Sequence, residues 1–310
     1  MNELFSQFVI FLSIFLFGMF VMRQGLVNMQ EHHASKWLEQ LVDKPWKGLL
    51  VGTIVTSLLQ SSSAVIIISV GLVAAKMIPF SGAVGVILGA NIGTSVTLEI
   101  LAVDFTFFII PLLLIGVPLL FFQRRAFFCL GCVCFGLASI FIAMKGFESL
   151  AAPLSSLHTI YDALAMTKES HLLGISVGAL VTAVIQSSTA TTAVAMSFVN
   201  EHLFTLQTGV AIMLGANIGT CITVWLATIG GTIDMKRVAY AHIWVNIFGA
   251  VLFFPFIEVF SDWIAQTSSS PSQQLAHASL VYNAITSLVL LPFVNPFIRG
   301  IHWLYKGKKK

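Results

Sequence analysis

The sequence predicts an all-α integral membrane protein with two inverted-topology repeats, each containing a re-entrant helical hairpin and a broken transmembrane helix. Three observations predict this fold: an apolar composition, an internal duplication, and apolar arms too short to cross a bilayer. Hydrophobic residues make up 57% of the 310 residues and charged residues only 9%. This balance indicates a chain whose solvent is lipid rather than water.

The first apolar run, Leu4 to Met22, is long enough to cross a hydrocarbon core of about 30 Å. Glu3 stands where a cleavable signal would carry basic residues, and no small-residue cleavage site follows, so we expect a retained span. The net charge of +3 does not indicate a nucleic-acid partner, because the basic residues follow the membrane topology described below.

A gap-free duplication covers much of the chain. Residues 52–97 align on residues 178–223, and both copies contain G-x-x-V-T-x-x-x-Q-S-S-x-A followed by L-G-A-N-I-G-T-x-x-T. Because the two motifs keep the same separation in both copies, we interpret the chain as two similar units.

The duplication also sets the expected domain boundaries. We expect repeat unit one at 1–125, repeat unit two at 126–258, and a C-terminal span with a basic cytoplasmic tail at 259–310. Each unit has the same order: a span, an amphipathic stretch, a Gln-Ser hairpin, and a helix with G-A-N-I-G-T. A further span ends each unit.

The polar run Q60-S-S-S63 separates two apolar arms, Trp46 to Leu59 and Ala64 to Lys76. Each arm reaches only about 18 Å as a helix, so neither can span alone. A single long helix would place the polar run at mid-membrane on all its faces. We therefore favour a re-entrant hairpin, whose polar tip can line a wet cavity.

The next segment, Pro79 to Asp104, is long enough to cross but contains G89-A-N-I-G-T94 at its midpoint. Two glycines around an asparagine predict a broken helix. In a second interpretation, which stays open, the glycines let two helices pack closely.

Unit one is predicted to cross the membrane three times, at 4–22, at the broken helix and at 107–122. Because three is an odd number, unit two enters the membrane in the opposite orientation. Trp244 to Phe256 and Leu280 to Phe297 add a sixth and a seventh crossing. One face then receives only Lys145 and Lys168. The other face collects the remaining basic residues: Arg23, Lys36, Lys44, Lys47, Lys76, Arg124, Arg125, Lys236, Arg237, Arg299, Lys306, Lys308, Lys309 and Lys310. The positive-inside rule predicts a multi-pass cell (plasma) membrane protein with its N-terminus outside and its C-terminus cytoplasmic.

The paired Q-S-S-S and Q-S-S-T runs, each followed by G-A-N-I-G-T, resemble the signature repeats of the type II sodium-dependent phosphate cotransporters and their bacterial relatives. The resemblance implies sodium-coupled uptake of inorganic phosphate by alternating access, at a site where hairpin tips meet broken helices. The implied binding residues are Gln60, Ser61, Ser62, Ser63, Asn91 and Thr94 in unit one, with Gln186, Ser187, Ser188, Thr189, Asn217 and Thr220 in unit two.

The chain departs from the family pattern in S95-V-T-L-E99, where the resemblance implies a neutral polar residue in place of Glu99. A carboxylate inside a span is functional by default, so Glu99 is a candidate for ion coupling. The alternative is a carboxylate that reaches water at the extracellular end.

Physical chemistry independently supports an anion and a cation in one site. Hairpin tips and helix breaks expose N–H groups that attract anions and carbonyls that suit a hard cation. Neither motif contains Lys or Arg, and the nearest, Lys76, is 13 residues from Ser63. A bound phosphate therefore needs co-bound cations. We expect sodium at the same tips and breaks, and no other cofactor.

The motifs also bear on other classes of function. No enzyme is expected, because neither motif has a nearby His or Lys and the chain has no H-E-x-x-H, G-x-S-x-G or P-loop. Two inverted hairpins indicate alternating gates rather than a channel. Two alternatives stay open. The Gln-Ser runs can instead form structural hydrogen bonds between helices. The protein can also be a sodium- or proton-coupled carrier of sulfate or a carboxylate. The expected partners are inorganic phosphate, sodium and the lipid bilayer, without nucleic acid. Homodimer formation stays open.

Overall fold

The computed structural model describes residues 2–30, 33–104, 106–156 and 170–306, and these residues form helices and no strand. In chain order the elements are α1 (Asn2–Gln30), α2 (His33–Leu41), α3 (Pro45–Leu59), α4 (Ser62–Ala74), α5 (Phe80–Ala102), η1 (Thr106–Phe108), α6 (Ile109–Leu119), α7 (Arg125–Ser155), α9 (His171–Ile185), α10 (Ser188–Asn200), α11 (Leu206–Gly219), α12 (Cys221–Ala227), α13 (Ile233–Phe253), η2 (Phe254–Phe256), α14 (Ile257–Ala265), α15 (Pro271–Leu290), η3 (Leu291–Phe293) and α16 (Val294–Leu304).

Six helical segments within the described part of the chain are long and apolar enough to cross a membrane. They are Glu3–Met29, Phe80–Ala102, Arg125–Ser155, Leu206–Ala227, Ile233–Ala265 and Pro271–Leu304. The structure thus confirms an all-helical protein with the composition of a multi-pass membrane protein.

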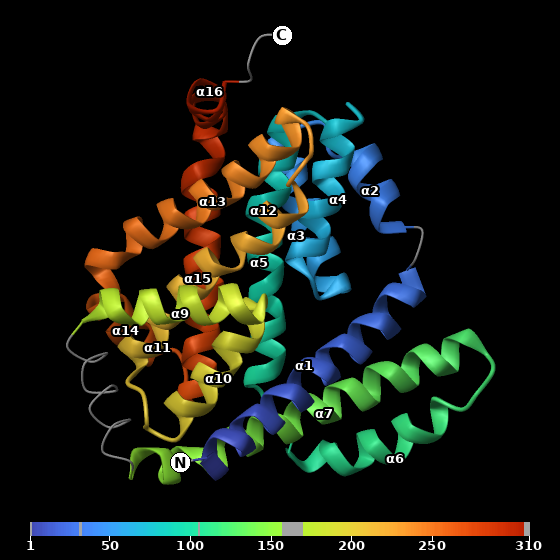
Figure 1. Ribbon diagram of the computed structural model, residues 1–310, viewed down its shortest axis with the longest axis vertical. Coiled ribbons are helices and arrows are strands. Elements are labelled where there is room, and N and C mark those ends of the chain that lie inside the picture. Colours follow the sequence, from blue (N-terminus) through green and yellow to red (C-terminus); the bar gives the residue numbers. More distant parts are fainter. Residues whose placement is uncertain (1, 31–32, 105, 157–169, 307–310) are drawn as a thin grey trace.

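The segment 107–122, expected to cross, differs from the expectation because its α-helix α6 has only 11 residues. Such a helix reaches roughly 16 Å, about half of a hydrocarbon core. It packs beside α7 near the end of the molecule where the N-terminus lies (Figure 1). Gly116 makes the close approach to α7 feasible, since a Cβ there would lie 2.8 Å from the Phe135 nitrogen.

Each Gln-Ser run separates two short helices. α3 ends at Leu59 and α4 begins at Ser62, while α9 ends at Ile185 and α10 begins at Ser188. The four helices have 13 to 15 residues each. They are therefore shorter than a membrane span, as the arm lengths predicted.

The predicted break in the helix of unit one is wrong. α5 runs without interruption from Phe80 to Ala102, straight through the G-A-N-I-G-T motif. In unit two the helix is interrupted at Thr220, between α11 and α12. The helix therefore continues through the first copy of the motif and is interrupted at the last residue of G-A-N-I-G-T in the second copy.

Close packing explains the glycines better than breaks do. A Cβ at Gly89 would overlap the carbonyl oxygen of Leu49 on α3. In the second unit a Cβ at Gly215 would overlap the carbonyl oxygen of Ile175 on α9. These glycines let each motif helix touch the first arm of its Gln-Ser pair backbone to backbone, as small residues do in membrane helix packing.

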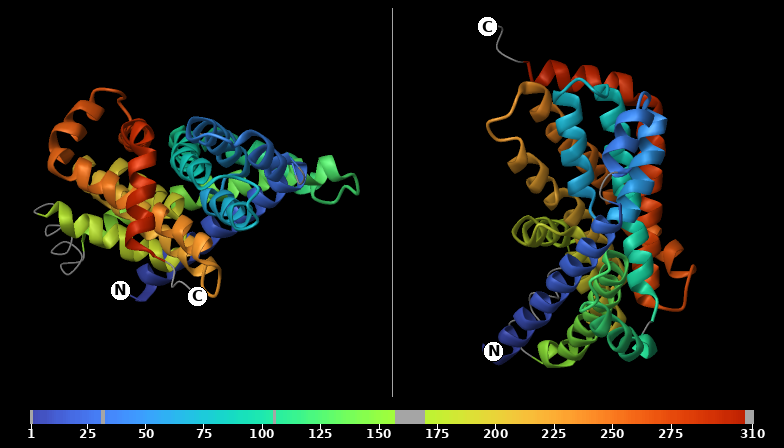
Figure 2. Two further views of the ribbon diagram at one scale, coloured as in Figure 1. Left: turned by 90° about the horizontal axis from the view of Figure 1, so that it is seen from above. Right: turned by 90° about the vertical axis from the view of Figure 1, so that its right-hand side faces the viewer.

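The described ends of the chain lie at opposite ends of the molecule (Figure 1; Figure 2, right). α5 leads toward the N-terminal end, whereas α11 and α12 lead away from it (Figure 1). The α4–α5 and α12–α13 connections lie near α16 (Figure 1). Lys76 belongs to the first connection, and Lys236 and Arg237 are near the start of α13. Lys168 and Lys308 to Lys310 lie outside the described residues.

Polar side chains join α15 to the middle and the C-terminal half of α5. Ser287 Oγ donates to the Leu88 carbonyl at 3.1 Å, and Asn283 Nδ2 donates to Ser95 Oγ at 2.8 Å. Inside a bilayer such interhelical hydrogen bonds satisfy hydroxyls and amides that have no water partner. They attach the C-terminal helix to the motif helix of the first unit.

Candidate functional site

The two Gln-Ser runs, far apart in sequence, line one cavity of about 160 Å³. One water needs about 10–15 Å³ of such volume, so the cavity has room for a small oxyanion with its cations. The lining residues are Arg23, Gln60, Ser61, Ser62, Ser63, Thr94, Thr97, Gln186, Ser187, Ser188, Thr189, Thr220 and Thr223.

The first run turns the chain at Gln60. This residue adopts a left-handed conformation with φ 55°, and its N–H donates to the Thr56 carbonyl at 2.7 Å, which closes the end of α3. Ser61 then caps α4, because its Oγ accepts a hydrogen bond from the Ala64 N–H at 3.3 Å. Helix end and helix start thus meet within two residues.

The second run repeats this geometry. Gln186 has φ 59°, and its N–H donates to the Thr182 carbonyl at 2.7 Å. Ser187 Oγ accepts from the Ala190 N–H at 3.2 Å. A left-handed non-glycine residue is uncommon, so its recurrence at matched glutamines indicates one local structure used twice. We call the segments 60–63 and 186–189 the two tips.

The tips bring both signs of partial charge to the cavity. The first N–H groups of α4 and α10 have no partner within their own helices, and the helix dipole makes these ends positive. The last carbonyls of α3 and α9 are the corresponding negative ends. Hydroxyls of the tip serines can donate to an anion or offer oxygen to a cation. The arrangement can therefore hold an oxyanion beside a hard cation.

Four threonines from the motif helices complete the wall. Thr94 and Thr220 were expected in the site, whereas Thr97 and Thr223 were missed. The signal was present in the sequence, because both missed residues end the duplicated G-A-N-I-G-T-x-x-T motif. Residues three apart on a helix share a face, so Thr94 and Thr97 point the same way on α5. The buried hydroxyl of Thr223 has no hydrogen-bond partner among the residues that the structure describes.

Arg23 was assigned from sequence to one membrane face and was not expected in the site, but the structure places it in the cavity lining. α1 continues past Met22 to Gln30, so Arg23 lies inside the helix rather than at its end. Its Nε donates to the main-chain carbonyl of Gln60 at 2.7 Å. The cavity therefore contains a guanidinium that the motifs do not show.

Two expected site residues lie outside the cavity lining. Asn91 donates through Nδ2 to Asn246 Oδ1 at 3.1 Å, and Asn246 in turn donates to the His242 carbonyl at 2.9 Å. Asn217 Nδ2 contacts the sulfur of Met213, one turn away on α11, at 3.6 Å. Both asparagines make contacts between or within helices, and the structure does not bring them together with the tips.

Glu99 is also separate from the cavity lining. Its Oε2 lies 3.5 Å from His277 Nε2 on α15, while its buried Oε1 has no hydrogen-bond partner within the described ranges. His277 Nδ1 shares a hydrogen bond with Thr267 Oγ1 at 2.8 Å. Glu99 therefore belongs to the contact between α5 and α15.

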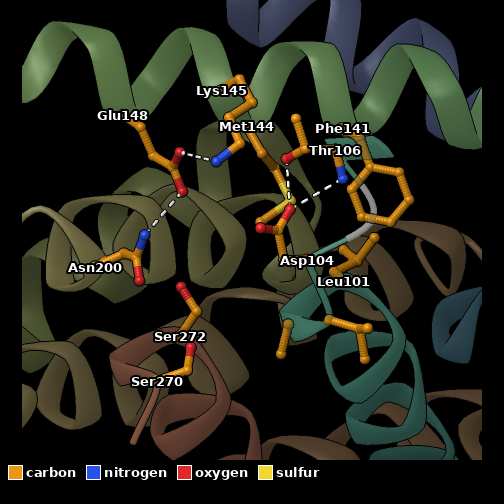
Figure 3. A pocket seen from close by; sticks show the side chains of 12 residues that line it. Leu101, Asp104, Thr106, Phe141, Met144, Lys145, Glu148, Asn200, Ser270 and Ser272 are labelled. Carbon is orange, nitrogen blue, oxygen red and sulfur yellow. Dashed lines mark hydrogen bonds and ion pairs between the residues drawn. The ribbon is translucent and has the colours of Figure 1, made fainter. Parts of the chain in front are cut away.

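A second cavity, of about 270 Å³, lies between the end of α5, the helices α7 and α10, and the start of α15 (Figure 3). Lys145 Nζ pairs with Glu148 Oε2 at 2.9 Å, and Asn200 Nδ2 donates to Glu148 Oε1 at 3.1 Å. These contacts tie the last residue of α10 to α7. Beside them, hydrogen bonds from the Thr106 hydroxyl and N–H lower the pKa of Asp104, so its carboxylate stays charged.

Comparison with known proteins gives one family. A family model described as Na+/Pi-cotransporter matches residues 14–149 and 155–264. These two stretches include both tips and both copies of the G-A-N-I-G-T motif. No solved structure matches the chain.

Three similar proteins match large parts of the chain. The uncharacterized protein YqeW of Bacillus subtilis is 36% identical over 97% of this chain and 98% of its own length. YjbB of Escherichia coli, by name an inorganic phosphate export protein, is 25% identical over 93% of this chain, which spans 53% of YjbB. The human sodium-dependent phosphate transport protein 2B is 29% identical over 48% of this chain and 22% of its own length.

Proposed function

Because the chain belongs to the Na+/Pi-cotransporter family, we propose that it is a secondary active transporter that takes up inorganic phosphate together with sodium. The observation that carries the proposal is the single cavity lined by both tips, which come from opposite halves of the sequence. A substrate held there contacts both repeat units at once, as alternating access requires.

The cavity lining suits phosphate. Serine and threonine hydroxyls from both tips and the N–H groups at the starts of α4 and α10 are donors for a tetrahedral oxyanion. The human relative's name, which describes sodium-dependent phosphate transport, supports the same substrate and the same coupling ion. Sulfate and carboxylates are the alternative substrates to be excluded.

The same cavity provides oxygen ligands for sodium. The helices α3 and α9 end at Gln60 and Gln186 in the cavity lining, and the serine and threonine hydroxyls of the lining supply oxygens. Hard cations prefer such oxygen ligands. We therefore place phosphate and sodium in one composite site, where the cations offset the charge of the anion.

For the transport cycle we propose that the α3–α4 and α9–α10 pairs are re-entrant hairpins of two inverted repeats. The opposite courses of α5 and α11–α12, the short helix lengths and the meeting of both tips support this arrangement (Figure 1). With the basic connections cytoplasmic, the N-terminus lies outside the cell membrane. The end of α5, which lines the second cavity, then faces the outside (Figure 1).

An enzymatic role has no support at the cavity. A serine nucleophile needs a base within hydrogen-bond reach. Among the described residues that line the cavity, none is a His, Asp, Glu or Lys. We therefore propose binding and release of phosphate without chemical change.

The test is uptake of radiolabelled phosphate into proteoliposomes with an inward sodium gradient, compared with potassium or a proton gradient. Ser188→Ala should reduce sodium-driven uptake at least tenfold at subsaturating phosphate, since a hydroxyl to a charged ligand is lost. Ser176→Ala is the matched control, because Ser176 is exposed on α9 and donates to the Leu172 carbonyl of its own helix. Uptake that needs no sodium, or that sulfate or a carboxylate suppresses more strongly than phosphate does, would reject the proposal.

One observation favours a second candidate function, phosphate export. The relative YjbB, which matches nearly all of this chain, carries an export name. Net efflux from phosphate-loaded cells that express the protein, against a maintained inward sodium gradient, would favour export. Net accumulation under the same conditions would favour uptake.

A further inference from the structure

Arg23 is the residue of the cavity that neither motif explains. It belongs to α1, whose span Glu3–Met29 continues beyond it for about 9 Å of helix. A charged residue at that position in a membrane helix is costly, and such residues are functional by default. The position therefore requires a physical reason.

A hydrogen bond to the main chain explains the position of Arg23 only in part. The Nε–H donates to the Gln60 carbonyl at the end of α3, where the helix dipole favours a positive charge. A guanidinium has five N–H donors, and this contact uses one of them. The remaining donors belong to a side chain that lines the cavity.

The charge of Arg23 has no counterpart in the cavity. Among the described residues of the lining, Arg23 is the single ionisable side chain, and all the others are Gln, Ser or Thr. The cavity thus has a formal charge of +1 before any ligand enters. An oxyanion relieves this charge, whereas a sodium ion alone increases it.

We propose that Arg23 binds the phosphate and acts as a built-in counter-charge that replaces one coupling cation. This inference rests on the proposed function and adds to it the charge balance of the site. The planar fork of Arg suits the oxygens of phosphate. Its attachment to Gln60 connects the occupied cavity to the first tip, so phosphate, Arg23 and the end of α3 form one unit.

The experiment compares Arg23→Gln, Arg23→Lys and the control Arg299→Gln, which removes an exposed arginine of α16. Equilibrium binding of radiolabelled phosphate is measured over a range of sodium concentrations. For Arg23→Gln we expect a loss of phosphate affinity of about ten- to a hundredfold at fixed sodium. The sodium concentration for half-maximal phosphate binding should also rise. Arg23→Lys keeps the charge and should hold that sodium concentration near its wild-type value.

A role limited to capping α3 gives a different result. Thermal stability then falls, while the folded protein keeps its phosphate affinity and its sodium dependence. If Arg23→Gln binds phosphate with the same affinity and sodium dependence as Arg299→Gln, the inference is overturned. The proposed function fails separately, if the wild-type protein neither binds nor transports phosphate.

A second measurement covers the case in which Arg23→Gln does not fold. Phenylglyoxal modifies accessible arginines of the wild-type protein, and mass spectrometry gives the rate at each arginine. Saturating phosphate with sodium should slow the modification of Arg23 at least several-fold and leave Arg299 unchanged. Equal rates at Arg23 with and without phosphate overturn the inference.

Discussion

Thr223 offers a test of whether the cavity binds its ligands through hydroxyls. Thr223 lines the cavity, and its buried Oγ1 has no hydrogen-bond partner in the described part of the chain. A buried hydroxyl without a partner costs about 1–3 kcal/mol, so Thr223→Val should leave the ligand-free protein equally stable or more stable. A hydroxyl that binds a charged ligand contributes roughly 1.5–3 kcal/mol. The same change should therefore weaken binding of phosphate or sodium by about ten- to a hundredfold.

Thr286 supplies the matched control. Its Oγ1 is also buried without a partner, but it lies on α15 beside Gly249 and not in the cavity lining. Thr286→Val should keep or raise thermal stability and leave transport unchanged. Phosphate binding at saturating sodium and sodium activation at saturating phosphate are measured for both variants. If Thr223→Val matches Thr286→Val in both assays, the hydroxyl at 223 binds neither ligand and the reasoning fails.

Three further predictions follow from the contacts. Gly89→Ala should lower stability by about 1–3 kcal/mol because its Cβ meets α3, whereas Gly71→Ala, with open space around it, should be neutral or stabilising in thermal unfolding. Ser62→Ala and Ser188→Ala should each weaken phosphate binding by about tenfold or more, and normal binding in either would make that tip a packing element. Glu99→Gln should leave the sodium dependence of phosphate binding unchanged, because Glu99 faces His277. A changed sodium dependence would restore its ion-coupling role.

Much of the site followed from sequence because local chemistry and length determine it. The arms around Gln60 are too short to span, and the polar run between them would lie on all faces of a single helix, so the tips could be placed. The duplication then indicated that the two tips act together. Their meeting at one cavity depends on tertiary packing, which periodicity alone does not give.

The role of the glycines could not be decided from sequence. Gly89 in an apolar segment is compatible with a helix break and with close packing, because both need a residue without a Cβ. The distinguishing fact is the partner: the Leu49 carbonyl lies where the Cβ would be. Arg23 was missed for a related reason. An apolar run that ends at Met22 does not reveal that the helix continues to Gln30.

The charge balance of the cavity bears on the direction of transport. A coupled carrier is reversible, and the sum of the ion and phosphate gradients sets its direction. Each charge moved across the membrane is worth about 2.3 kcal/mol per 100 mV. A carrier whose Arg23 replaces one sodium moves one fewer cation per phosphate and therefore loses that ion's electrical and chemical driving force. We expect it to reverse at a smaller phosphate gradient than a carrier with a neutral residue at this position. The accumulation ratio of phosphate at fixed sodium gradient and membrane potential measures this difference.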